Sequence, residues 1–112
     1  MDIGTIAEKL KLKIICGESR LGETVTGGYA GDLLSDVMGN SKKGDIWVTR
    51  QVHQNTVAVA ALKELAAIVI VQNASPDADT VQRAETEGVV LLVSAQPAFE
   101  VVGEIYRLLR GA

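Results

Sequence analysis

Two short runs of apolar, largely β-branched residues constrain the fold of this chain more than any other feature. They are Ala67–Val71 (AIVIV) and Val89–Val93 (VVLLV), and neither contains a polar residue. A strand that faces water on one side alternates apolar and polar residues, whereas a strand covered on both faces does not. The two runs therefore predict central strands of a parallel sheet with helices packed on both of its faces.

Segments with a helical spacing of apolar residues alternate with extended segments along the chain. Beyond the two central strands, extended segments are expected over residues 13–17, 23–29 and 44–49. Helices are expected over residues 2–12, 32–39, 56–65, 75–88 and 97–110. Short strands joined by single helices are typical of parallel strands with helical crossovers. We therefore predict a three-layer α/β/α fold with a mostly parallel sheet of about five strands.

Composition and charge exclude several function classes. Apolar residues make up 47% of the 112 residues and aromatic residues only 4%, so Val, Ile, Leu and Ala must fill the core of a single domain spanning residues 1–112. The net charge is −3 and no basic block occurs, so we expect no nucleic-acid partner. No apolar run approaches the roughly 20 residues of a membrane helix, and the first residues lack a signal pattern. We expect a cytoplasmic protein without a membrane partner.

Several conspicuous residues have a structural explanation. Cys16 is the only cysteine and lies in an apolar run, where the role of a small buried hydrophobe is expected. His53 is the only histidine and lies far from Cys16 in sequence, which gives no metal-ligand spacing. Asp77 and Asp79 suit the first turn of a helix, and Trp47 lies on an expected strand, in the core or an interface. We predict neither a metal nor a cofactor.

A glycine-rich segment, TVTGGYAGDLLSDVMG (residues 24–39), lies between an extended segment and a helix. This is the usual setting of a phosphate-binding loop. However, no Lys or Arg occurs from Leu21 to Ser41, and Asp32 is expected to cap the helix where a phosphate would sit. We predict that Gly27, Gly28 and Gly31 allow a sharp turn instead. A phosphate loop or a site for a non-anionic ligand remains the alternative.

A polar heptapeptide, TRQVHQN (residues 49–55), follows the strand expected over residues 44–49. In a parallel sheet this position is the carboxyl end of a strand, where ligands usually bind. The structural alternative is that Asn55 caps the next helix and that His53 lies on the surface or bonds a backbone carbonyl. A catalytic His53 would need a partner within hydrogen-bond reach, and Asp32 and Asp36 are the carboxylates we propose as neighbours.

The inward face of the last helix is predicted to carry Phe99, Val102, Ile105, Tyr106 and Leu109. Leu108 falls outside this stripe. Exposure of Leu108 would indicate a partner surface, although a solvated helix end is the simpler explanation.

The segment VTGGYAGDLLSDVM (residues 25–38), followed by GDIWVT (44–49), HQN (53–55) and AVA (58–60), resembles the stand-alone DRTGG-domain proteins. Those proteins resemble the N-terminal domain of HPr kinase/phosphorylase and of certain Mur ligases, which implies a three-layer α/β/α fold. The resemblance also implies a regulatory or interaction module of the kind fused elsewhere to CBS pairs or to a phosphotransacetylase. Only Thr26-Gly27-Gly28 of the naming motif is present, and the sequence carries no kinase phosphate loop.

Together these observations predict a regulatory or protein-interaction domain without catalytic activity, which forms a homodimer and senses a small metabolite or nucleotide or binds a protein partner. The alternative is a small transferase or hydrolase in which His53 acts as a base oriented by Asp32. The candidate ligand or partner surface comprises Gly27, Gly28, Tyr29, Asp32, Thr49, Gln51, His53 and Asn55.

Overall fold

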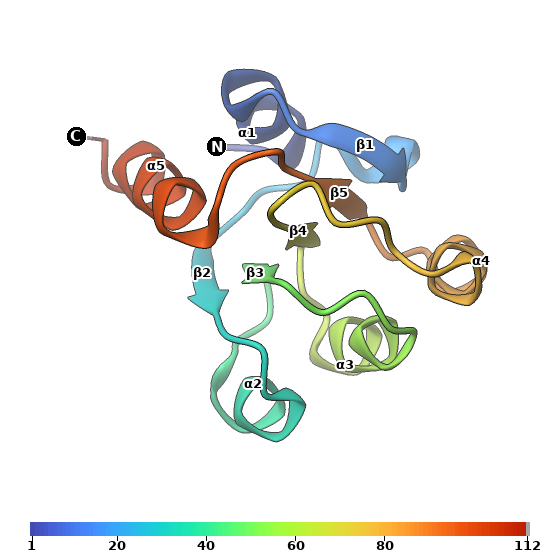
Figure 1. Cartoon of the computed structure of the whole chain (residues 1–112). Coiled ribbons are helices and arrows are strands. Elements are labelled where there is room, and N and C mark those ends of the chain that lie inside the picture. The colour runs from blue at the N-terminus through green and yellow to red at the C-terminus, as the bar shows by residue number, and fades with distance from the viewer. Residues whose placement is uncertain (112) are drawn as a thin grey trace.

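The computed structural model describes residues 1–111 and is built around a five-stranded sheet (Figure 1). The strands are β1 (Lys13–Cys16), β2 (Gly27–Ala30), β3 (Asp45–Thr49), β4 (Ala67–Ile70) and β5 (Leu91–Val93). Their order is β1-β5-β4-β3-β2. Strands β2 to β5 are parallel and β1 pairs antiparallel with β5, so the expected mostly parallel sheet is confirmed.

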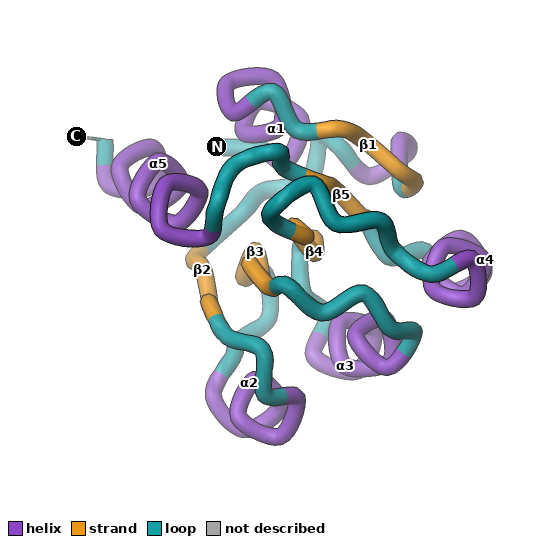
Figure 2. The backbone as a smooth tube through the Cα atoms, viewed as in Figure 1, coloured by secondary structure: helices purple, strands orange, loops and turns teal. Residues whose placement is uncertain are grey.

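Helices cover both faces of this sheet, which confirms the three-layer α/β/α fold (Figure 2). The helices are α1 (Ile3–Leu10), the short 3₁₀ helix η1 (Glu18–Arg20), α2 (Leu34–Asn40), α3 (Asn55–Lys63), α4 (Ala78–Glu87) and α5 (Ala98–Arg110). Helices α2, α3 and α4 join successive parallel strands and pack on one face, because right-handed crossovers that advance in one direction stay on one side. Helices α1 and α5 pack on the other face.

Strands β4 and β5 are apolar without alternation because both of their faces are buried. Every residue of β3 and β4 is buried. Ile46 and Val48 face α1 and α5, whereas Trp47 between them faces the opposite layer. The Trp47 indole is fully buried and donates a hydrogen bond of 2.8 Å to the Gly31 carbonyl, so its predicted core position is confirmed.

The ends of the helices agree only in part with the sequence signals. Asp2 caps α1, as predicted, and its carboxylate accepts a hydrogen bond of 2.7 Å from the Thr5 amide. The expectation that α4 begins at residues 75–76 is wrong, because α4 follows Asp77. The Asp77 amide and the Thr80 hydroxyl both donate hydrogen bonds to the Val52 carbonyl. These bonds hold the loop before α4 against the loop before α3, so the helix begins later in the chain than expected.

The inward face predicted for α5 is also wrong in part. Phe99 is 87% exposed and Tyr106 is 60% exposed, whereas Val101 and Ile105 are buried in the core. Leu108 packs against that core as well. The spacing of apolar residues in α5 allows two overlapping stripes, and the branched aliphatic side chains fill the space against the sheet while both aromatic rings remain outside.

Gly17 offers a test of the backbone geometry that connects β1 to η1. Its φ is +96°, and a Cβ at this position would lie 2.7 Å from the Val90 Cα in the loop before β5. Left-handed backbone alone costs a side-chain-bearing residue about 1–2 kcal/mol. We therefore expect Gly17→Ala to lower the free energy of unfolding by about 2 kcal/mol or more, measured by urea denaturation.

Gly22→Ala is the matched control, because a Cβ at Gly22 meets nothing within 4 Å. Its free energy of unfolding is expected to stay within about 0.5 kcal/mol of the parent value. An equal loss in both variants would contradict the account given for Gly17.

Candidate functional site

Gly27 and Gly28 belong to strand β2 rather than to a loop. Neither has a positive φ, nor has Gly31, so the prediction that these glycines allow a sharp turn is wrong. A Cβ on Gly27 would lie 2.7 Å from Asp45 Oδ1, and Asp45 Oδ2 accepts a hydrogen bond of 2.8 Å from the Lys42 amide. Glycine is therefore required at position 27 because the Asp45 carboxylate occupies the space that a side chain would need.

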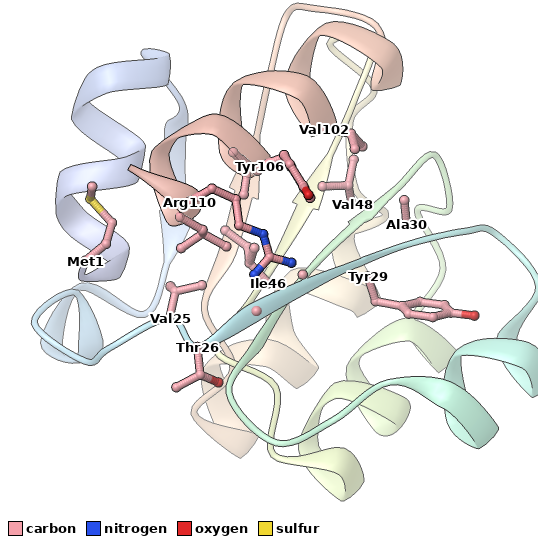
Figure 3. A pocket seen from close by; sticks show the side chains of 14 residues that line it. Met1, Val25, Thr26, Tyr29, Ala30, Ile46, Val48, Val102, Tyr106 and Arg110 are labelled. Carbon is pink, nitrogen blue, oxygen red and sulfur yellow. The ribbon is translucent and has the colours of Figure 1, made fainter. Parts of the chain in front are cut away.

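A groove lies between β2 and α5 and has a volume of about 280 Å³ (Figure 3). It forms because β2 places small residues beside large ones: Gly28 pairs with Ile46 and Ala30 pairs with Val48. The small residues of the edge strand therefore leave open space beside α5, while Ile46 and Val48 beneath them stay buried. The lining residues are Met1, Val25, Thr26, Gly27, Gly28, Tyr29, Ala30, Ile46, Val48, Val102, Ile105, Tyr106, Leu109 and Arg110.

The groove combines an apolar floor with a positively charged rim. Ile46 and Val48 form the floor, and Arg110 and Tyr106 extend over it from α5 (Figure 3). The Arg110 guanidinium lies 4.8 Å from the centre of the Tyr106 ring, a distance at which a cation and an aromatic face attract each other. The lining residues include no Asp or Glu. This arrangement suits a ligand with a flat apolar part and a negatively charged group.

Tyr29 points away from the groove and toward α2 (Figure 3). Its hydroxyl donates a hydrogen bond of 2.5 Å to Asp36 Oδ2, and Asn40 donates to the other oxygen of this carboxylate. The Asp36 carboxylate holds the phenolic proton and so raises the pKa of Tyr29 above its usual range, with a smaller contribution from desolvation. Tyr29 therefore links β2 to α2, and only its strand position borders the groove.

Asp32, Thr49 and Gln51 meet at the carboxyl ends of β2 and β3. Asp32 Oδ1 accepts hydrogen bonds of 2.8 Å from the Thr49 hydroxyl and from the Arg50 amide. Gln51 donates a hydrogen bond of 2.9 Å from its side chain to the Asp32 carbonyl. The prediction that Asp32 caps α2 is wrong: the N-cap is Leu33, and the carboxylate instead satisfies the buried Thr49 hydroxyl.

His53 is paired with Asp77 rather than with Asp32. Its Nδ1 lies 2.9 Å from Asp77 Oδ2, and both side chains are largely exposed to solvent. The proposed His53–Asp32 pair is therefore wrong, because the loop before α4 is held against the loop before α3 and brings Asp77 to this place. Asn55 does not cap α3 either; it is the first residue of the helix, and Gln54 is the N-cap without a side-chain bond.

The thiol of Cys16 is not available as a nucleophile. Cys16 is buried and its Sγ donates to the Val89 carbonyl at 3.6 Å. Burial raises the pKa of this thiol, and the nearby Glu85 and Glu18 carboxylates add to the effect. Across residues 1–111, no three His, Cys, Asp or Glu side chains lie close enough together to hold a metal ion.

The α5 side of the groove is missing from the surface predicted from the sequence. That surface lacks Arg110, and the predicted inward face of α5 wrongly includes Tyr106. Tyr106 and Arg110 are four residues apart and therefore adjacent on one helix face. This spacing is visible in the sequence, whereas the position of α5 over β2 is not, because β2 and α5 are distant along the chain.

The fold and the groove define a three-layer α/β domain with an open groove beside its edge strand β2. No family model matches the sequence, and no curated protein matches it. None of the helices within residues 1–111 is long and apolar enough to cross a membrane.

Among solved structures, the fold is similar to that of the CBS and DRTGG domains of the regulatory region of a Clostridium perfringens pyrophosphatase, complexed with its activator diadenosine tetraphosphate. The TM-score is 0.68 at 11% sequence identity, and the match covers 91% of this chain and 44% of that one. This chain thus spans less than half the length of its structural neighbour. The likeness concerns the fold alone and supports the DRTGG-like architecture that the sequence resemblance implies.

The Tyr29–Asp36 hydrogen bond can be tested by titrating the tyrosines. With Tyr106 replaced by Phe, the remaining tyrosine should ionise above its usual pH range, because the Asp36 carboxylate stabilises the protonated phenol. We expect Asp36→Asn to move this ionisation to lower pH, measured by ultraviolet absorbance of the phenolate. An unchanged midpoint would show that the hydrogen bond does not control the pKa of Tyr29.

The Asp32 carboxylate can be tested through the buried hydroxyl that it satisfies. Asp32→Ala leaves the Thr49 hydroxyl without this acceptor and should lower the free energy of unfolding by about 1–3 kcal/mol. Asp32→Asn should cost less, since it keeps an acceptor oxygen. Glu8→Ala on the exposed side of α1 is the control in the same urea denaturation, and a similar effect of all three substitutions would exclude a specific role of Asp32.

Proposed function

We propose that this chain is a cytoplasmic regulatory domain without catalytic activity, which binds a nucleotide in the groove between β2 and α5. The observation that carries this proposal is the groove itself, with its apolar floor over Ile46 and Val48 and its cation, Arg110, at the rim. A nucleotide has both of the matching parts, a flat base and a charged phosphate.

The two parts of such a ligand would meet different chemistry. A base placed over Gly28 and Ala30 would remove from water the apolar surface of these exposed residues and of the half-buried Val102 and Leu109. A phosphate would reach the Arg110 guanidinium, whose planar fork suits phosphate oxygens. The structural neighbour is complexed with diadenosine tetraphosphate as its activator, which supports a nucleotide over other planar anions. Its likeness to this chain is in the fold, so the choice of nucleotide stays part of the proposal.

The polar groups outside the groove support a role without catalysis. The Asp32 carboxylate is engaged by Thr49 and Arg50. The His53–Asp77 pair lies exposed at the surface, where water can compete for both side chains. General acid–base catalysis by His53 would need a reacting group held beside it, and the hydrogen bonds next to this pair instead join the loops before α3 and α4 through the Val52 carbonyl.

Calorimetric titration tests the proposal directly. The chain is titrated with ATP, AMP and diadenosine tetraphosphate at physiological salt, and we expect at least one of them to bind. Gly28→Leu should weaken that binding at least tenfold, because the new side chain fills the groove. A Cβ on Gly28 has its nearest contact at 3.5 Å, so the substitution should leave the strand intact.

Two control variants separate the groove from general effects. Gly39→Leu adds the same side chain to α2, where a Cβ meets nothing within 4 Å, and should leave the affinity unchanged. Arg110→Gln should weaken binding of the phosphorylated ligands, whereas Arg83→Gln removes an equal charge from α4, outside the groove lining, and should not. Absence of binding by all three nucleotides, or binding insensitive to Gly28→Leu, would overturn the proposal.

A further inference from the structure

The outward face of α5 carries a row of exposed residues that the fold of the single chain does not use. Phe99, Gly103, Tyr106 and Arg110 follow one another at intervals of four, three and four residues. All four are exposed, and Phe99 is 87% exposed. This spacing places them along one line of the helix surface and is typical of residues that meet a second helix. Val101 and Ile105 on the other side of α5 are buried in the core, so Phe99 and Gly103 face away from it, whereas Tyr106 and Arg110 also border the groove.

Gly103 is the residue of this row that is hardest to explain within one chain. It lies near the middle of a helix of 13 residues, where glycine is less favourable than alanine. A Cβ at Gly103 would meet nothing within 4 Å, so no close contact inside the chain requires glycine there. A shallow hollow exists at this point, lined by Phe99, Glu100, Gly103, Glu104 and Arg107. The missing side chain lets another surface approach the helix closely.

The charges beside the row indicate which surface fits. Glu100 and Arg107 lie seven residues apart and therefore on the same side of the row. When two copies of α5 pack antiparallel about a two-fold axis, this side of one helix meets the same side of the other. Glu100 then lies opposite Arg107 of the partner subunit, and Arg107 lies opposite Glu100 of the partner subunit. The charge pattern is thus complementary to itself in the antiparallel arrangement.

We propose that the α5 face formed by Phe99, Glu100, Gly103, Tyr106 and Arg107 is the docking surface for a second copy of this chain. The two helices pack antiparallel, and the missing side chain at Gly103 lets them approach closely near the two-fold axis. Each α5 contributes the same residues, as a closed two-fold interface requires. The docking surface borders the groove at Tyr106, whereas Glu100, Gly103 and Arg107 lie outside the groove lining, so substitutions at these three residues test the dimer without entering the nucleotide site.

Sedimentation equilibrium of the full chain, from low to high micromolar concentration, tests this proposal. The parent chain should form a dimer whose fraction rises with concentration. Glu100→Arg and Arg107→Glu should each weaken the dimer at least tenfold, since each sets like charges against each other across the axis. Equimolar mixing of these two variants should restore association as a heterodimer. The arginine introduced in one variant then faces the glutamate introduced in the other, and the native Glu100 faces the native Arg107.

Further variants distinguish this interface from other causes of association. Gly103→Leu should abolish the dimer by filling the hollow, with circular dichroism confirming a folded monomer. Glu85→Arg, an exposed charge reversal on α4, should leave the dimer unchanged. A parent chain that stays monomeric throughout, or a dimer that Glu100→Arg and Gly103→Leu both leave intact, would overturn the proposal. Nucleotide titration of Glu100→Arg, at a residue outside the groove lining, shows whether the groove still binds a nucleotide when the dimer is lost.

Discussion

The burial of β3 and β4 on both faces is the constraint on which the rest of the structure depends. These strands contain no position that can face water, so each face needs a helical layer of its own. The three crossover helices supply one layer, and they leave the opposite face to α1 and α5. Helix α5 must therefore lie across β2 and β3, and this placement creates both the groove and the exposed outer face of the helix.

The architecture of the layers could be predicted from the sequence because it follows from local patterns. The unbroken apolar runs at residues 67–71 and 89–93 predict buried parallel strands, and the structure contains β4 and β5 within them. The antiparallel pairing of β1 with β5 could not be predicted, since a four-residue strand at an edge carries no signal of its direction. The direction of β1 depends on the path of the chain from Cys16 to β2 at the opposite edge of the sheet, and this path is a property of the whole fold.

The candidate site was less predictable because its residues take part in contacts between distant segments. Asp32 stands in a typical capping position, yet its carboxylate bonds to the buried Thr49 hydroxyl of the neighbouring strand. A local preference of about 1 kcal/mol for a cap is readily outweighed when a buried hydroxyl needs an acceptor. His53 similarly pairs with Asp77, because the Val52 carbonyl holds the two loops together. The glycines of β2 resemble those of a loop in the sequence, whereas in the fold they belong to a strand, and Gly27 leaves room for the Asp45 carboxylate of β3.

The two proposals meet on one helix, which has a thermodynamic consequence. Tyr106 and Arg110 line the groove and also belong to the outward row of α5. A nucleotide phosphate that engages Arg110 changes the charge and the side-chain position at the edge of the docking surface. Binding and association are then linked, and each must alter the other by the same factor. A ligand that draws Arg110 into the groove would leave the Tyr106 ring free to meet the partner subunit, which favours the dimer. Coupling of this kind needs no movement of the sheet, because both surfaces lie on α5 and the rigid core only holds that helix in place.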